Sequence, residues 1–280
     1  HAYEILFSPT GGTAKVAAAL TTDWSSVKTI DLSIPSTHYE DICLESDSLA
    51  VIAMPAFGGA APQLALDRLS RIHGNGALCV IAAVYGNRAY EDTLVLLEDY
   101  AQTAGFQVIA AVSAVAEHSI IHQYAAGRPN SADCQELAAF GRQILQKAIS
   151  GNLSVPEIPG NRPSKHSETG MVPNVMHFLR SGAQKCPAGA IPPDNCKTTD
   201  KTKCISCMRC VSLCPVHARE VNPVMTAVAA KILKKSCTQE KANELFFKKI
   251  PPDSSITDSF LHKTHQKAEQ NVESEMLLPK

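Results

Sequence analysis

Four closely spaced cysteines stand in the second half of the chain, in the stretch Cys204-Ile-Ser-Cys207-Met-Arg-Cys210-Val-Ser-Leu-Cys214-Pro. Three thiolates spaced C-x2-C-x2-C can bind three corners of one cubane iron–sulfur cluster from a single loop, and a further Cys-Pro completes the bacterial motif. Structural zinc sites normally use two well-separated pairs of ligands. The spacing therefore favours an iron–sulfur cluster over zinc.

The other cysteines indicate the same chemistry. Of the ten in the chain, seven fall between Cys186 and Cys237. The start at His1 rather than Met indicates a trimmed or partial N-terminus, and no signal-like apolar segment follows it. Crowded cysteines without such a segment argue for metal binding in a reducing compartment rather than for a disulfide scaffold. No run approaches the ~18–20 apolar residues that span a bilayer, so we expect a cytoplasmic protein.

A second, incomplete cysteine motif lies upstream, where Cys186-Pro-Ala-Gly-Ala-Ile resembles the end of a first motif of the same kind. The same spacing would place its other ligands at positions 182, 179 and 176. Those positions hold Gly182, Leu179 and Met176, none of which can replace a thiolate. The sequence therefore predicts that a second cluster has been lost.

One [4Fe–4S] cluster remains, and its fourth ligand comes from a distance because in two-cluster proteins the Cys before Pro binds the other cluster. The expected ligands are Cys186, Cys204, Cys207 and Cys210. Cys214 stays a candidate metal-binding residue, since it can replace Cys186, pair with Cys196 or remain a thiol. We favour Cys186.

Five short apolar runs alternate with helical patterns before residue 150. The strand candidates are residues 3–7, 27–32, 49–54, 77–84 and 107–115. Strand–helix alternation predicts a parallel sheet with helices on both faces. The expected fold is α/β, a doubly wound five-stranded parallel sheet, with a ligand crevice at the carboxyl ends of its strands.

A turn rich in hydroxyls and glycine follows the first strand. It offers five candidate contacts to a phosphate, namely Ser8, Thr10, Gly11, Gly12 and Thr13. Backbone N–H groups at a helix N-terminus can bind a phosphate there. The turn lacks the G-K-[ST] ending of a Walker loop and does not fit G-x-G-x-x-G. The alternative is a plain helix start.

Two more loops end at the same edge of the predicted sheet, and both place aromatic residues beside glycine. Their candidate contacts to a flat ring are Pro55, Phe57, Gly58 and Gly59 after the third strand, and Tyr85, Gly86, Asn87, Arg88 and Tyr90 after the fourth. Together the three loops favour a flavin mononucleotide (FMN) site. The alternative is that Phe57 and Tyr85 only cap the core.

These segments carry a resemblance to the flavodoxin–ferredoxin fusion proteins of anaerobic bacteria. The matching stretches are F-S-P-T-G-G-T, V-Y-G-N-R-A-Y, E-H-S, A-G-R-P, P-G-N-R-P and C-I-S-C-M-R-C, and the match covers about residues 2–245. The resemblance implies FMN on a flavodoxin-like domain, followed by a small ferredoxin-like iron–sulfur domain. This chain departs from it in the missing cysteine motif, in Phe57 where Tyr is expected, and in Ala60 where Arg is expected.

The expected organisation is a flavodoxin-like domain at 2–150, a linker at 151–175, a 4Fe-4S ferredoxin-type domain with a C-terminal helix at 176–246, and a disordered tail at 247–280. The composition is that of an ordinary globular protein, and the net charge of −1 offers no attraction for nucleic acid. The leading hypothesis is an electron-transfer protein that serves a redox partner protein or a small-molecule electron donor or acceptor. The alternatives are an FMN-dependent reductase of an unknown small substrate and a regulatory module without flavin. His118 and His122, beside the crevice, are read as structural residues rather than proton donors.

Overall fold

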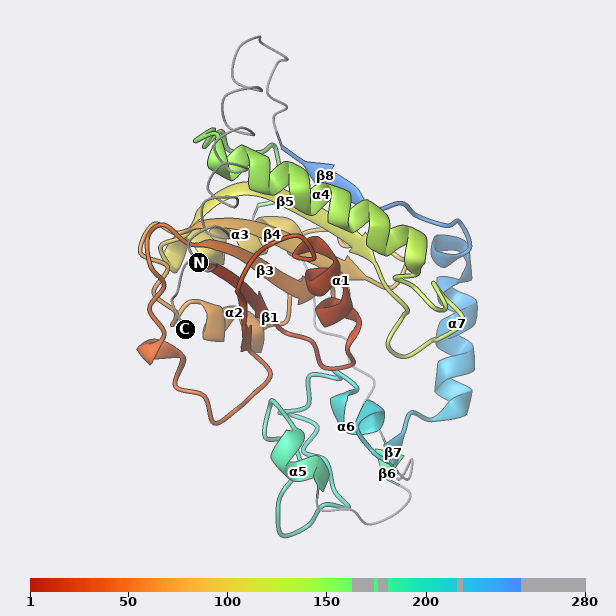
Figure 1. The fold of residues 1–280 in the computed structure, drawn as a ribbon. Coiled ribbons are helices and arrows are strands. Elements are labelled where there is room, and N and C mark those ends of the chain that lie inside the picture. Colours follow the sequence, from red (N-terminus) through yellow and green to blue (C-terminus); the bar gives the residue numbers. More distant parts are fainter. Residues whose placement is uncertain (163–173, 176–180, 216–218, 248–280) are drawn as a thin grey trace, which may run out of the picture. The chain divides into compact units, whose positions relative to one another are not determined.

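The first half of the chain folds around a six-stranded sheet in the order β2-β1-β3-β4-β5-β8. The computed structural model describes residues 1–162, 174–175, 181–215 and 219–247 (Figure 1). Its strands are β1 (Ala2–Leu6), β2 (Val27–Asp31), β3 (Leu49–Pro55), β4 (Leu78–Tyr85), β5 (Gln107–Val115) and β8 (Glu244–Phe246). The first five are parallel, as the sequence predicts, and their order is that of flavodoxin-like doubly wound sheets.

Helices cover both faces of this sheet. They are α1 (Gly12–Leu20), α2 (Gln63–Leu69), α3 (Thr93–Thr103) and α4 (Ser131–Ile149), with a short 3-10 helix, η1 (Tyr39–Asp41). Helices α1 and α4 share one hydrophobic cluster with the sheet, and α2 and α3 share the other (Figure 1). Asn130 is the N-cap of α4 and forms a capping box. Its side chain accepts a hydrogen bond from the Asp133 backbone amide, and the Asp133 carboxylate accepts one from the Asn130 backbone amide.

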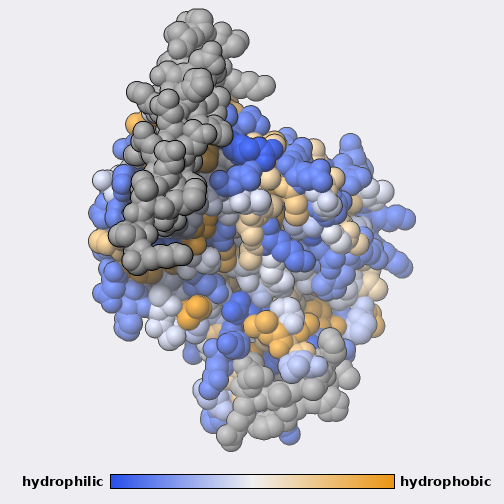
Figure 2. Space-filling model, in the orientation of Figure 1, coloured by the Kyte–Doolittle hydropathy of each residue, from blue (hydrophilic) through white to orange (hydrophobic). Residues whose placement is uncertain are grey.

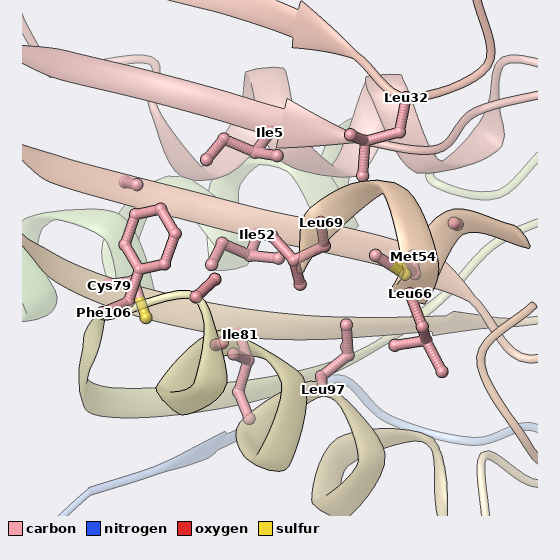
Figure 3. Packing of buried hydrophobic residues seen from close by; sticks show 14 of the residues in the cluster. Ile5, Leu32, Ile52, Met54, Leu66, Leu69, Cys79, Ile81, Leu97 and Phe106 are labelled. Carbon is pink, nitrogen blue, oxygen red and sulfur yellow. The ribbon is translucent and has the colours of Figure 1, made fainter. Parts of the chain in front are cut away.

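The central strands are apolar on both faces because helices bury both. Alternate residues of β3 and β4 serve the two clusters, so Ile52 and Ile81 face α2 and α3 while Val51 and Val80 face α1 and α4. Figure 3 shows Ile52 and Ile81 packed among the α2 and α3 side chains. Each buried aliphatic side chain contributes about 1.5–3 kcal/mol. The core therefore fixes the strand ends that carry the loops.

The second half is built from short elements. These are β6 (Asn174–Val175), α5 (Ser181–Lys185), α6 (Arg209–Ser212), β7 (Arg219–Glu220) and the longer α7 (Pro223–Cys237), with β6 and β7 paired antiparallel. Among the described helices, none has the length and apolar character needed to cross a membrane. In Figure 2 hydrophobic residues gather on the surface in the region of α6, and Leu213 at the end of this helix is half exposed.

Strand β8 adds an antiparallel edge that the sequence analysis did not predict. Its residues pair with β5, with Leu245 opposite Val112. The chain thus returns from the cysteine-rich segment to the first sheet, and both halves form one compact unit, His1–Lys248. The expected domain boundaries remain a prediction. Several of the expected features lie outside the described residues. They are residues 163–173 of the linker, Met176 and Leu179 of the lost motif, and the tail apart from Phe247.

Candidate functional site

Four thiols converge on one cavity in the second half of the chain. It is lined by Cys186, Cys204, Cys207 and Cys210 together with Pro187, Ala188, Ala190, Ile191, Thr199, Ile205 and Met208. All four cysteines are free thiols. The structure therefore brings the distant Cys186 to the three cysteines of the compact motif.

The loop that carries three of these thiols is bent by two residues in the left-handed region. Ser206 has a φ of 54° and Met208 a φ of 61°, and α6 begins at the next residue. Such backbone is uncommon outside glycine, and here it turns successive cysteines toward one point. Cys186 comes from the turn after α5, where the Ala190 amide donates to its sulfur at 3.3 Å.

Backbone amides and burial set the electrostatics of the cavity. Burial raises the pKa of the Cys207 thiol to about 12. The backbone amide of Arg209, which donates to the Cys207 sulfur, acts in the opposite direction and lowers this pKa. Burial also raises the pKa values of Cys204 and Cys210, while the Arg219 guanidinium acts in the opposite direction on both. Thiolates are the metal-binding form. This set of sulfurs therefore suits a group that brings positive charge into the cavity.

The donor set fits an iron–sulfur cluster better than a single ion. In the part of the chain that the structure describes, no three Cys, His, Asp or Glu side chains are placed to hold one metal ion. A zinc ion would need four ligands at about 2.0–2.3 Å. The C-x2-C-x2-C spacing of the loop, together with Cys186 on the same cavity, instead supplies the four thiolate ligands of a [4Fe–4S] cluster.

Cys214 lies elsewhere. It is buried, follows α6 in the sequence, and does not line the cavity of the other four thiols. Cys196 is also buried and packs beside Cys186 without lining the cavity, and its carbonyl oxygen accepts from Arg219 at 2.8 Å. The geometry thus agrees with the choice of Cys186, rather than Cys214, as the partner of the loop.

The loop after β1 has the features of an anion site. Gly11, with a φ of 94°, is the N-cap of α1 and offers no side-chain cap, and the Ser8 hydroxyl accepts from the Ala14 amide at 2.9 Å. Within the described residues, the backbone amides from Thr10 to Thr13 donate to no other group. The first turn of α1 also lacks an acidic residue. Free N–H groups at the positive end of a helix attract a phosphate.

The loop after β3 forms a tight turn beside it, because β1 and β3 are neighbours. Phe57 and Ala60 exchange two backbone hydrogen bonds across Gly58 and Gly59, whose φ values are 63° and 97°. A Cβ on Gly59 would meet the Glu91 carboxylate at 2.1 Å, so only glycine fits. Phe57 is partly buried and packs against the core.

The loop after β4 is committed to other contacts. The Asn87 amide donates to the carbonyl oxygens of Cys237 and Gln239 and accepts from the Lys241 amide. Asn87 therefore fastens the segment after α7, and both N–H donors of its side-chain amide are used for these contacts. The Arg88 guanidinium pairs with Glu91 at 2.8 Å.

The two tyrosines of this loop pack against each other. Their rings meet edge to face at 5.4 Å between centroids, and burial raises the pKa of both Tyr85 and Tyr90 to about 12. The Tyr90 hydroxyl donates to Glu244 of β8. The burial of Tyr85 agrees with the alternative interpretation, in which this side chain caps the core. Gly86 is required because a Cβ there would meet His118 at 2.7 Å.

His118 acts as a structural hydrogen-bond acceptor. Its Nδ1 accepts from the amides of Ile120 and Ile121, at 3.2 Å each, and burial lowers its pKa. The exposed His122 pairs with Glu117 at 2.7 Å. Both contacts agree with the structural reading of these histidines.

Three arginines near the candidate sites were not singled out by the sequence analysis. Arg68 and Arg209 connect the cysteine-rich segment to the first half of the chain, whereas Arg219 bonds within that segment. Arg68 of α2 donates to the carbonyl oxygens of Leu32 and Pro187, at 2.7 Å each, and so ties the turn after Cys186 to the sheet. Arg209 donates to the Ser8 carbonyl oxygen at 3.3 Å. Nothing but their place beside a cysteine motif distinguishes Arg209 and Arg219 in the sequence.

Helix α6 therefore lies on the loop after β1. Besides the Arg209 contact, the Ser212 hydroxyl donates to the Pro9 carbonyl oxygen at 3.4 Å. Because α6 begins within the cysteine motif, this helix connects the cavity of thiols to the loop after β1.

Comparison with known proteins agrees with this arrangement. Residues 197–220 match the family model described as "4Fe-4S binding domain". A search of curated proteins finds no match. The chain thus has a flavodoxin-like sheet followed by a 4Fe–4S binding domain.

Solved structures similar to the first half include several flavodoxins. One from the domain Archaea is 15% identical, covers 53% of this chain and 98% of its own, with a TM-score of 0.39. The Fusobacterium nucleatum flavodoxin bound to flavin mononucleotide is 13% identical, covers 52% and 98%, and scores 0.37. The Streptococcus pneumonia TIGR4 flavodoxin is 16% identical, covers 52% and 98%, and scores 0.37. The fold assignment rests on the strand order rather than on these similarities.

Proposed function

We propose that this protein transfers electrons between FMN and a single [4Fe–4S] cluster. The observation that carries the proposal is the contact between the two candidate sites. The cysteine loop continues into α6, and α6 donates hydrogen bonds to two carbonyl oxygens of the loop after β1. A short connection of this kind suits two redox centres that exchange electrons.

FMN exchanges one or two electrons and an iron–sulfur cluster passes one at a time, so together they join hydride-level chemistry to single-electron flow. The chain would hold the cluster through the thiolates of Cys186, Cys204, Cys207 and Cys210. Apolar side chains such as Ile191 and Ile205 line that cavity and limit water. The buried Arg219 supplies a positive charge nearby, and charge and hydrogen bonding tune cluster potentials.

The flavin would be held at the carboxyl edge of β1, β3 and β4. Its phosphate fits the loop formed by Ser8, Thr10, Gly11, Gly12 and Thr13. Its ring fits Phe57 and the Gly58–Gly59 turn. The buried Tyr85 and the Asn87 side chain lie outside this proposed set, because the structure commits them to other contacts.

Electrons must come from and go to molecules outside the chain. We propose a redox partner protein or a small-molecule donor or acceptor for this role, in a reducing cytoplasmic environment. The motif cysteines support this, since their thiols must remain reduced to bind iron.

The direct test is anaerobic purification followed by measurement of iron, sulfide and flavin per chain. We expect about four iron, about four sulfide and about one FMN. Iron near eight would contradict the single cluster. A brown protein that neither contains nor binds flavin would contradict the electron-transfer proposal and leave the regulatory alternative.

A further inference from the structure

Arg209 stands where the cysteine motif meets the loop after β1. It lies between Cys207 and Cys210 and is the first residue of α6. Its side chain is only 15% exposed. The motif therefore fixes the backbone of Arg209, while the side chain leaves the cysteine cavity and reaches toward the other site.

The guanidinium is only partly satisfied in that position. Nη1 donates to the Ser8 carbonyl oxygen at 3.3 Å, and Nη2 lies 3.8 Å from an Asp31 carboxylate oxygen. Nε is buried and has no hydrogen-bond partner among the described residues. A guanidinium offers five N–H donors, and leaving a buried one unpaired is costly. The arrangement calls for a further acceptor.

The neighbouring loop after β1 also contains hydrogen-bond donors without acceptors. The amides from Thr10 to Thr13 donate to no other group in the described part of the chain. Loop amides and Arg209 are thus unsatisfied donors within one small region, and both favour an anion. Arginine is well suited to phosphate because its planar donors match two phosphate oxygens.

We propose that Arg209 binds the phosphate of FMN, so that the cluster-binding segment supplies part of the flavin site. This inference rests on the proposed function and adds a residue from the other half of the chain to it. It implies that the two cofactors bind cooperatively. A cluster that orders the motif places Arg209 for the phosphate, and by linkage bound FMN stabilises the cluster-binding loop equally.

The test compares FMN with riboflavin, which lacks the phosphate, in Arg209→Gln and wild-type protein that retain the cluster. Dissociation constants come from quenching of flavin fluorescence, and iron and sulfide assays verify the cluster. We expect FMN affinity to fall about ten- to hundredfold, as for loss of a charge-assisted hydrogen bond, and riboflavin affinity to remain unchanged. Arg142→Gln is the matched control, because Arg142 pairs with Asp23 on the surface.

Two results would overturn the inference. Either FMN affinity is unchanged in Arg209→Gln, or FMN and riboflavin weaken equally, which would make Arg209 a tether of the loop only. If Arg209→Gln fails to fold or to hold the cluster, Arg209→Lys gives the same readout. The preference for FMN over riboflavin should then fall severalfold, and an unchanged preference overturns the inference. Wild-type protein that binds no FMN would instead overturn the proposed function.

Discussion

Arg68 gives the sharpest prediction about how the two halves are joined. Its guanidinium is buried and donates to two carbonyl oxygens, Leu32 O on the sheet side and Pro187 O next to Cys186. It also lies over the Tyr39 ring, 5.7 Å from the centroid. Arg68→Met keeps much of the apolar stem and removes these interactions.

The expected loss follows from the bonds removed. A hydrogen bond from a charged group contributes about 1.5–3 kcal/mol, so two give about 3–6 kcal/mol. A cation–π contact adds about 0.5–2 kcal/mol, and relief from burying a cation offsets part of the total. We expect a net loss of about 3–5 kcal/mol, which is large against a typical total stability of about 5–15 kcal/mol.

Guanidinium chloride unfolding and the rate of iron loss to a chelator are the assays. Both should respond, because Pro187 follows the cluster ligand Cys186. Arg71→Met is the matched control, since Arg71 is exposed on the same segment. If Arg68→Met unfolds at the same denaturant concentration as Arg71→Met and loses iron no faster, Arg68 does not join the two halves.

Three further predictions concern the sites themselves. Cys186→Ser should lower the iron content strongly, whereas Cys214→Ser should retain it; the reverse pattern in iron and sulfide assays would make Cys214 the fourth ligand. Arg219→Gln should lower the cluster reduction potential, because it removes a buried positive charge that stabilises the added electron, and a redox titration that shows no change or a rise would refute this. Burial lowers the pKa of His118 below 6.5, so the unfolded chain takes up its proton first as the pH falls. Stability should therefore decrease from about pH 6.5 down to the folded pKa, and the denaturation midpoint of His118→Asn should lack this decrease; parallel pH profiles would show that His118 makes no such contribution.

Much of the fold could be predicted because its signals are local. Buried parallel strands appear as continuous apolar runs, and all five expected strands are present. Strand β8 was missed because Glu244–Phe246 is too short to show a period and its pairing partner lies far away in the sequence. Non-local pairing of this kind leaves no local pattern.

In the candidate site, too, local sequence patterns could be predicted, whereas contacts with distant residues could not. Cys186 could be predicted as a partner of the compact motif because it precedes Pro at the end of a second, incomplete motif and a cluster needs four thiolates. It lines the same cavity as the three cysteines of the compact motif. Asn87 was expected at the flavin because it follows a strand end, yet its partners come from residues 237–241. Arg68 and Arg209 could not be predicted from the sequence because charged residues usually lie in solvent, and only the folded chain shows them buried or nearly so.

Electron transfer within one molecule tests the central claim most directly. Protein that contains both cofactors is reduced at one centre, by light-driven reduction of the flavin or by a one-electron donor to the cluster. Absorbance then follows the flavin and electron paramagnetic resonance follows the cluster across a wide dilution series. The account predicts that electrons introduced at one centre appear at the other at a rate independent of protein concentration. No transfer in either direction, or a rate proportional to protein concentration, would contradict it.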